Sequence, residues 1–200
     1  MKIDTHVHSK FSSDCSTELR EIVEHAKSIG LDGVCITDHN FLVPNVRRQI
    51  EALTDRNLLV LCGMEYHTNH GHMLTFGLRA NPFHQKYKPI QQVINWVNKH
   101  GAAIIPAHPY EEGYTHTLGD YVFSLRGLVA LETQNGAKSR ELNDKAEQAR
   151  QKLGLKGIGG SDAHCAEQVG RRFTIFENKI TNMDDLVREL KEGRYHAGMA

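Results

Sequence analysis

The stretch Asp4-Thr5-His6-Val7-His8 stands near the start of the chain and decides how the rest of the sequence is interpreted. Its alternation is typical of a short β-strand, with Ile3 and Val7 on one face and His6 and His8 on the other. Two imidazoles on one face of a strand lie close enough for a single metal ion to bind both. An alternating strand with two histidines on a solvent-facing surface is the competing interpretation, and the remaining sequence has to decide between them.

Strand-like and helix-like segments alternate along the whole chain outward from this stretch. Compact apolar runs predict strands over residues 33–37, 58–64, 72–78, 102–106, 128–131, 156–160 and 173–176. Helices are predicted from a Ser16 cap to Gly30, after Pro44, from Pro89 to Gly101, over 138–153 and from a Thr181 cap to Gly193, with a short one near 118–125. Only residues 66–71 separate the strands 58–64 and 72–78, so this pair is expected to form a hairpin. The alternation predicts one α/β domain over residues 1–200, closed as a short and irregular barrel.

The composition excludes several classes of protein. Lys and Arg together number 24, as do Asp and Glu, so no bulk charge indicates a nucleic-acid or membrane partner. No secretion signal or transmembrane-length apolar run is present, and the four cysteines show no zinc-ribbon or redox spacing. We therefore expect a cytoplasmic protein with free thiols and no obligate protein partner. The unusual feature of the composition is the content of 13 histidines.

The histidines and carboxylates gather where the predicted strands end. Nine of them follow a strand, open the hairpin return or lie in the first loop: His6, His8, Asp14, His39, Glu65, His72, His108, Asp162 and His164. In α/β barrels the active site is built at the carboxyl ends of the strands. Five other histidines, which are His25, His84, His100, His116 and His196, are interpreted as surface or packing residues. His67 and His70 are assigned no role.

Nine donors exceed the coordination of a single ion and divide naturally into three sites. Glu65 is suited to bridge two of the ions, and mixed nitrogen and oxygen donors suit Zn, Mn or Fe. Three divalent ions with three carboxylates leave a strongly positive cluster that suits hydroxide and a phosphate group. Such clusters activate water for phosphoester hydrolysis.

These residues resemble the motifs of the polymerase and histidinol phosphatase (PHP) family over essentially the whole chain. The matching stretches are 4–8 with Asp14, 37–39, 63–65 with 71–72, 107–109 and 160–164. The resemblance implies a distorted seven-stranded β/α barrel with a trinuclear metal site. It assigns one ion to His6, His8, Glu65 and Asp162, a second to Glu65, His72 and His108, and a third to Asp14, His39 and His164. Some relatives carry histidine in place of Asp14, which leaves the identity of the third metal open.

Further residues near these motifs are candidates for supporting roles. We expect Asp38 to orient a neighbouring histidine through its other ring nitrogen, or else to serve as a turn residue. Glu132 is interpreted either as a substrate contact or as an ion-pair partner of Lys138 or Arg140. Arg171, Arg172 and Lys10 are candidate phosphate-binding residues, with solvated surface charges as the alternative.

The predicted function is a metal-dependent phosphoesterase in which a metal-bridging hydroxide attacks phosphorus; no general acid is assigned. The interval 40–64 has room for one helix only, so the site should be open to a small phosphomonoester, a nucleotide or an oligonucleotide end. Near-neutral charge argues against tight binding of long duplexes. An amidohydrolase-type hydrolase and a non-catalytic, metal-stabilised regulatory module are the alternatives.

Overall fold

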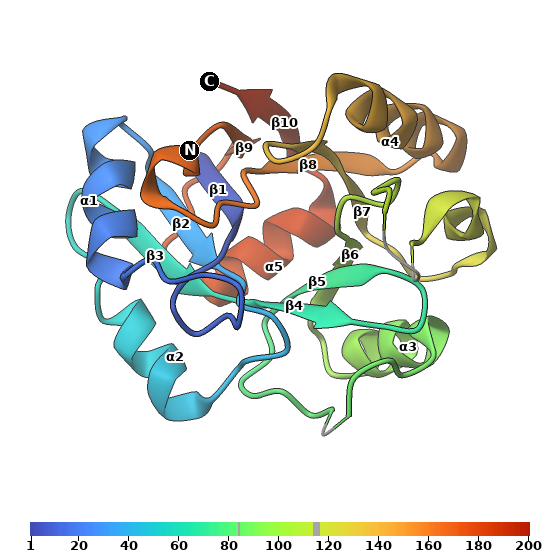
Figure 1. Cartoon of the computed structure of the whole chain (residues 1–200), viewed down its shortest axis with the longest axis horizontal. Helices are drawn as coiled ribbons and strands as arrows, with labels where there is room; N and C mark the ends of the chain where they lie inside the picture. Colours follow the sequence, from blue (N-terminus) through green and yellow to red (C-terminus); the bar gives the residue numbers. More distant parts are fainter. Residues whose placement is uncertain (84, 114–116) are drawn as a thin grey trace.

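A computed structural model of the chain describes residues 1–83, 85–113 and 117–200, so the predictions for His84 and His116 lie outside the described residues. The described elements alternate in a mixed α/β architecture (Figure 1). The strands are β1 (Lys2–Val7), β2 (Gly33–Ile36), β3 (Leu59–Cys62), β4 (Met64–His67), β5 (His72–Phe76), β6 (Ala103–Pro106), β7 (Ala130–Asn135), β8 (Lys156–Gly160), β9 (Arg172–Phe176) and β10 (Tyr195–Met199). The helices are α1 (Leu19–Ser28), α2 (Pro44–Glu51), α3 (Ile90–Lys99), α4 (Arg140–Leu153) and α5 (Met183–Glu192), with short 3₁₀ turns at Gly119–Ser124 and Ala166–Gln168.

The strands form three sheets in the described part of the chain, so the closed barrel is not confirmed. The largest has the order β10-β9-β1-β2-β3, the second β4-β5-β6 and the third β7-β8. β1, β2 and β3 run parallel, whereas β4 and β5 form the antiparallel hairpin that the short connection predicts. Isolated β-bridges join the sheets, including the parallel bridges from Val7 to Ala163 and from His39 to Glu65. The carboxyl ends of β1, β2 and β8 are thereby brought to one side.

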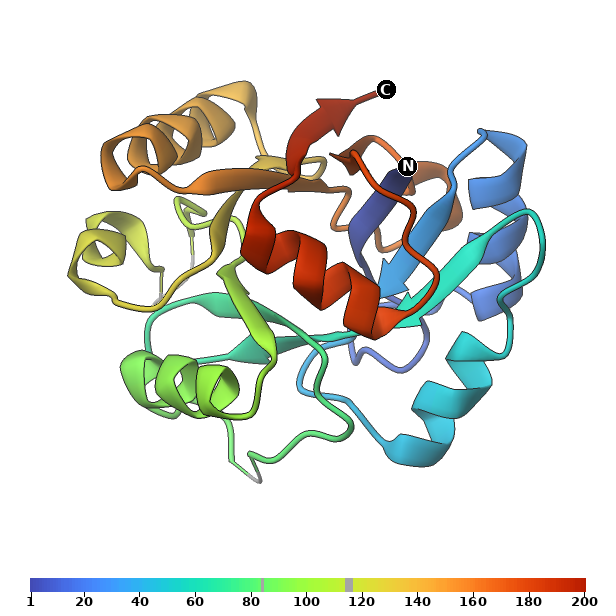
Figure 2. The same ribbon diagram turned by 180° about the vertical axis from the view of Figure 1, so that it is seen from behind.

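Two apolar clusters fix this arrangement. One lies between the strands and the outer helices, where Ile22 of α1 and Val93 of α3 are buried. The other lies among the strands and is completed by α5, whose Leu186 and Leu190 pack against it. Figure 2 shows α5 lying across the back of the strands. Burial of this apolar surface supplies the main driving force for the fold and holds the polar strand ends on the opposite side from α5.

Three details of the predicted elements need correction. The run 58–64 is divided at Gly63 into β3 and β4, and Glu65 lies within β4. Glycine is required at 63, because a Cβ there would lie 2.7 Å from the Thr75 carbonyl oxygen. The caps of α1 and α5 are Glu18 and Asn182, not Ser16 and Thr181. The strand β10 was not expected.

Among the described helices, none combines the length and the apolar character needed to cross a membrane.

Candidate metal centre

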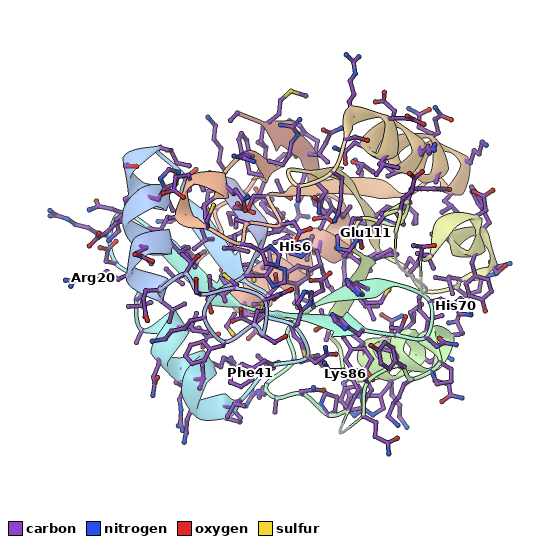
Figure 3. The ribbon with its side chains drawn as sticks, viewed as in Figure 1. His6, Arg20, Phe41, His70, Lys86 and Glu111 are labelled. Carbon is purple, nitrogen blue, oxygen red and sulfur yellow. The ribbon has the colours of Figure 1, made fainter. Side chains whose placement is uncertain are left out.

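Four donor atoms converge at the carboxyl ends of β1 and β8 and near the start of β4, which carries Glu65. We call His6, His8, Glu65 and Asp162 the inner group. His6 Nε2 lies 3.1 Å from Glu65 Oε2 and 3.4 Å from Asp162 Oδ1, and His8 Nε2 lies 3.1 and 3.2 Å from the same two atoms. All four residues are buried. Figure 3 shows His6 near the middle of the molecule.

The inner group forms because β8 lies directly beside β1. The Asp162 amide donates to the His6 carbonyl at 2.8 Å, and the His8 amide donates to the Ala163 carbonyl at 3.0 Å. The approach requires glycine at 160, where a Cβ would lie 2.4 Å from the His6 Cβ. Asp162 itself has a positive φ of 55°, a conformation that costs free energy for a residue with a side chain. Backbone strain at Asp162 therefore accompanies the position of its carboxylate beside His6 and His8.

Buried carboxylates control the charge of the inner group. Burial disfavours a charged His6 ring, but Glu132, Glu65 and Asp162 outweigh it and raise the pKa of His6 well above its usual value. Burial is likewise outweighed at His8, where hydrogen bonds to Asp162 and Glu65 raise the pKa to about 9. Despite burial, the neighbouring histidines lower the pKa of Glu65 and of Asp162. Glu65 and Asp162 thus stay ionised, and positive charge near them is favourable.

A second set of donors shares Glu65 with the inner group. We call Glu65, His72 and His108 the middle group. Glu65 Oε1 lies 3.0 Å from His72 Nδ1 and 2.9 Å from His108 Nε2, while its Oε2 faces the inner histidines. His108 has a positive φ of 28°, so a second strained residue lies at this position. The two oxygens of one carboxylate therefore face two different donor groups.

A third set lies nearer the surface. We call Asp14, His39 and His164 the outer group; His8 also lies within reach of it. Asp14 Oδ2 lies 3.2 Å from His39 Nε2 and 3.4 Å from His164 Nε2. The side chains of Asp14 and His164 are 48% and 33% exposed, in contrast to the buried inner group. All three residues lie in loops outside the named helices and strands.

The structure therefore brings all nine predicted donors together, in three groups that match the three ligand sets implied by the family resemblance. Their binding of metal stays a prediction. The donor chemistry fits divalent transition-metal ions, because imidazole nitrogens and carboxylate oxygens alternate at ligand-like separations. The raised pKa values of His6 and His8 also show that this centre needs positive charge, which such ions would supply.

Glu132 lies behind the inner group, in a strand that is longer than predicted. It lies inside β7, because that strand continues through a bulge to Asn135 instead of ending at residue 131. Its carboxylate is fully buried, lies 2.9 Å from His6 Nδ1 and accepts the His108 amide at 2.7 Å. Asn135 Nδ2 donates to it at 2.9 Å. Glu132 thus lies behind His6, where it fixes the orientation of the ring, and its contact with a substrate stays a prediction.

Asp38 contacts the loop that follows β1. Its carboxylate accepts the Ser9 amide at 2.6 Å and the Ser9 hydroxyl at 2.8 Å. Among the described residues it makes no hydrogen bond to a histidine ring. Ser12 of the same loop lies 3.0 Å from His8 Nδ1 and accepts the His39 amide at 2.9 Å. Asp38 therefore fixes the loop that supports these histidines.

The three basic candidates lie outside the donor groups. Lys10 pairs with Glu18 at 2.7 Å. Arg172 Nε donates to Gln134 at 3.2 Å, and Arg171 is exposed. The structure brings none of these three side chains into a described contact with a donor residue, and their binding of phosphate stays a prediction.

Glu111, beside the middle group, was not predicted from the sequence. Glu111 Oε2 lies 3.0 Å from His108 Nδ1, and its other oxygen pairs with Lys138, whose Nζ lies 3.7 Å from Asp162 Oδ2. Burial opposes ionisation of Glu111, but His108 and Lys138 lower its pKa to about 2. The same Glu111, with Glu65, outweighs burial and raises the pKa of His108 to about 10. The spacing of His108 and Glu111, three residues apart, was the one available signal.

His67 was also left without a role. Its Nε2 lies 2.9 Å from His39 Nδ1, and its ring stacks on His72 with centroids 4.0 Å apart. Burial and the neighbouring rings of His72 and His39 lower the pKa of His67 to about 3. His67 therefore adjoins both the middle and the outer group.

Comparison with known proteins gives matches in sequence and in structure. A family model described as PHP-associated matches residues 140–195. An uncharacterized protein of Methanocaldococcus jannaschii is 31% identical over 136 residues, which are 62% of this chain and 77% of that protein. A probable phosphatase of Caldicellulosiruptor saccharolyticus is 36% identical over 61 residues, 30% of this chain and 24% of that protein.

Three solved structures share the fold. PsfC from Pseudomonas syringae has a TM-score of 0.77 at 20% identity, covering 100% of this chain and 91% of that one. A two-domain protein from Bacteroides vulgatus that contains a predicted PHP-like metal-dependent phosphoesterase has a TM-score of 0.71 at 22% identity, covering 100% and 64%. The lesion-specific endonuclease PfuEndoQ from Pyrococcus furiosus has a TM-score of 0.70 at 19% identity, covering 98% and 57%.

Proposed function

Because this chain belongs to the polymerase and histidinol phosphatase (PHP) family, we propose that its histidine-rich centre hydrolyses phosphoester bonds with divalent metal ions as cofactors. The observation that carries the proposal is the position of Glu65. Its two oxygens face the inner and the middle group at 2.9–3.1 Å, as a carboxylate that bridges two ions would. The matches to a probable phosphatase and to PHP-like phosphoesterases support the same class of reaction.

The proposal includes three ions, one for each donor group, and Zn, Mn or Fe as their identity. Bound divalent ions supply an activated water and neutralise the charge of a phosphate group. The three sheets would then be sections of one distorted seven-stranded barrel, and residues 1–200 a single catalytic domain. Support comes from the agreement between the three groups and the ligand sets implied by the resemblance.

The chain's own residues orient the donors from behind. Glu132 holds His6 at Nδ1, Ser12 holds His8 at Nδ1 and Glu111 holds His108 at Nδ1. Each contact leaves the opposite nitrogen, Nε2, pointing into the centre, and this kind of support fixes both ring orientation and tautomer. Lys138 adds positive charge beside Asp162.

The exposed outer group supports an open site. Between His39 and Glu65 the chain forms only α2 and β3, with no inserted segment over the centre. A small phosphomonoester, a nucleotide or an oligonucleotide end can therefore reach Asp14 and His164. The structural similarity to an endonuclease makes the oligonucleotide end a substrate to include.

The test is a substrate screen on the metal-loaded protein. Phosphomonoesters, nucleotides and short oligonucleotides are assayed with added Mn or Zn, alongside cyclic amides that report amidohydrolase activity. We expect phosphoester hydrolysis, and we expect His8→Ala and Asp162→Ala to lower kcat by about 10²- to 10³-fold while the protein stays folded. His196→Ala and Asp144→Ala, on the exposed surface, are the matched controls. Wild-type turnover in the Asp162 variant, or activity on cyclic amides alone, would overturn the proposal.

A further inference from the structure

Lys138 lies where the inner and middle groups meet. Its Nζ lies 3.7 Å from Asp162 Oδ2, and His108 Nε2 lies 3.9 Å from the same oxygen. Among the described lysine and arginine side chains, Lys138 is the one that pairs with a carboxylate of the three donor groups. We propose that Lys138 binds a non-bridging oxygen of the substrate and makes the centre selective for a terminal phosphate group over an internal phosphodiester.

The segment that carries Lys138 is fixed by its backbone. The Gly136 amide donates to the Gly160 carbonyl at 3.0 Å. A Cβ at residue 136 would lie 2.8 Å from the Ser161 carbonyl oxygen, so this close approach requires glycine. The segment between β7 and α4 is therefore packed against the turn that leads to Asp162. This backbone contact places Lys138 beside the donor groups independently of the ion pairs of its side chain.

The ammonium group of Lys138 is a cation with three N–H donors. Among the described residues its hydrogen-bond acceptor is Glu111, because the Asp162 oxygen at 3.7 Å is too distant for a normal hydrogen bond. The Lys138 side chain is 19% exposed, so solvent reaches it. Burial opposes its charge, but Glu111, Asp162 and Glu132 outweigh burial and raise the pKa of Lys138. The group therefore stays charged and can donate to a further oxygen.

The number of phosphate oxygens decides which substrate gains from this cation. A terminal phosphate has three non-bridging oxygens and a charge of about −1.5 to −2 at pH 7. An internal phosphodiester has only two non-bridging oxygens and a single negative charge. This step rests on the proposed function, in which ions of the inner and middle groups bind phosphate oxygens. A terminal phosphate then supplies one more oxygen for Lys138, which a phosphodiester lacks.

A purely structural role of Lys138 would act through Glu111, which lies 3.0 Å from His108 Nδ1. Two variants separate the two roles. Glu111→Gln removes the carboxylate and leaves the ammonium in place, whereas the double variant Glu111→Gln/Lys138→Met removes both charges. The comparison of these two proteins isolates the ammonium group and leaves no unpaired buried charge at Glu111.

The first experiment measures phosphate binding without any turnover. The wild type, Lys138→Met, Glu111→Gln and the double variant are loaded with Mn, their metal content is determined, and each is titrated with inorganic phosphate in a calorimeter. We expect Lys138→Met to bind phosphate about 10- to 100-fold more weakly than the wild type, and the double variant to bind it more weakly than Glu111→Gln by a similar factor.

Lys145→Met is the matched control, because Lys145 lies in α4 and pairs with Glu141 at 3.1 Å, away from the donor groups. We expect it to bind phosphate as the wild type does. Equal phosphate affinity in the wild type and Lys138→Met, or in the two proteins with Gln at position 111, would overturn the phosphate contact.

The second experiment measures selectivity. Values of kcat/KM are compared for p-nitrophenyl phosphate, a monoester, and bis(p-nitrophenyl) phosphate, a diester. We expect Lys138→Met to lose about 10- to 100-fold on the monoester, mainly through KM, and little on the diester. An equal loss on both substrates would overturn the selectivity. Absence of turnover in every protein would count against the proposed function, while the phosphate titration would still decide whether Lys138 binds phosphate.

Discussion

The inner and outer groups of the centre are built from the same kinds of side chain, but they are held in different ways. His6 and His8 lie on or directly after β1 and are fully buried, and each has a partner at its second ring nitrogen. Asp14 and His164 lie in loops and are partly exposed. The difference indicates that the inner group is fixed before any metal binds, whereas the outer group can rearrange. Preorganised donors lose less conformational entropy on binding, so the inner ion should bind more tightly.

The largest effect is expected where the inner and middle groups meet. Glu65→Gln removes the charge of the carboxylate that faces both groups, so kcat for a generic phosphoester should fall by about 10²- to 10³-fold. Glu51→Gln in α2, a carboxylate paired with Arg47, is the control. A Glu65 variant with unchanged turnover would show that the two groups do not act together.

The second-largest effect is expected from the competition between protons and zinc for the histidine rings. Metal binding requires neutral imidazoles, and in the metal-free protein the pKa values of His8 and His108 are raised to about 9 and about 10. Zinc affinity should therefore increase with pH up to this range, by up to about 100-fold per pH unit if both protons are displaced. A chelator-competition titration at several pH values measures it. An affinity that does not change between pH 6 and pH 8 would contradict this account.

The same raised pKa values predict how the stability of the metal-free protein changes with pH. A histidine whose pKa is higher in the folded state stabilises the fold below its unfolded pKa of 6.5, and this contribution is lost as the pH rises through about 9 to 10. The metal-free chain should thus become less stable in alkaline solution, while the metal-loaded chain should not.

Glu132→Gln tests the support of the inner group directly. The amide cannot accept at both of its terminal atoms, so His6 loses its fixed orientation, and metal affinity or activity should fall by about 10- to 100-fold. Separate measurement of metal affinity and KM checks the mechanism. An increase in KM with unchanged metal affinity would instead support the predicted substrate contact of Glu132.

The smallest effect is expected in the outer group. Asp14→Asn keeps an oxygen donor at a partly exposed position, so the affinity of one ion should fall by about tenfold and the others should be unaffected. Metal analysis after dialysis would show the loss of a single ion per chain. Loss of all bound metal would mean that the outer group is as essential to assembly as the inner one.

The strand and helix pattern could be predicted well where local signals are strong. Pro44 begins α2, and the short 66–71 connection gives the β4–β5 hairpin. β10 escaped prediction because its sequence, Tyr-His-Ala-Gly-Met, has no clear alternation and pairs in the described structure only with β9. Such an edge strand is stabilised by pairing and not by its own pattern.

The supporting residues were harder to predict than the donors. Residues 133–135 are polar and lie beyond the predicted strand 128–131, yet β7 continues through a bulge to Asn135, and Glu132 is buried within it. Glu111 and Lys138 are 27 residues apart, and no periodicity connects them. They pair because the loop after β6 lies against the segment before α4. This contact exists only in the folded chain.

The sequence by itself determined the α/β class and pointed to nine candidate donors, because histidines and carboxylates at strand ends leave a signal in residue type and spacing. The tertiary structure decided which residues hold the histidine rings from behind, and it set the distances at which the donors face one another. These properties depend on distances of about 3 Å between segments far apart in the chain, such as the one from His6 to Glu132. Packing of the strands around two apolar clusters sets those distances, and local sequence patterns do not encode them.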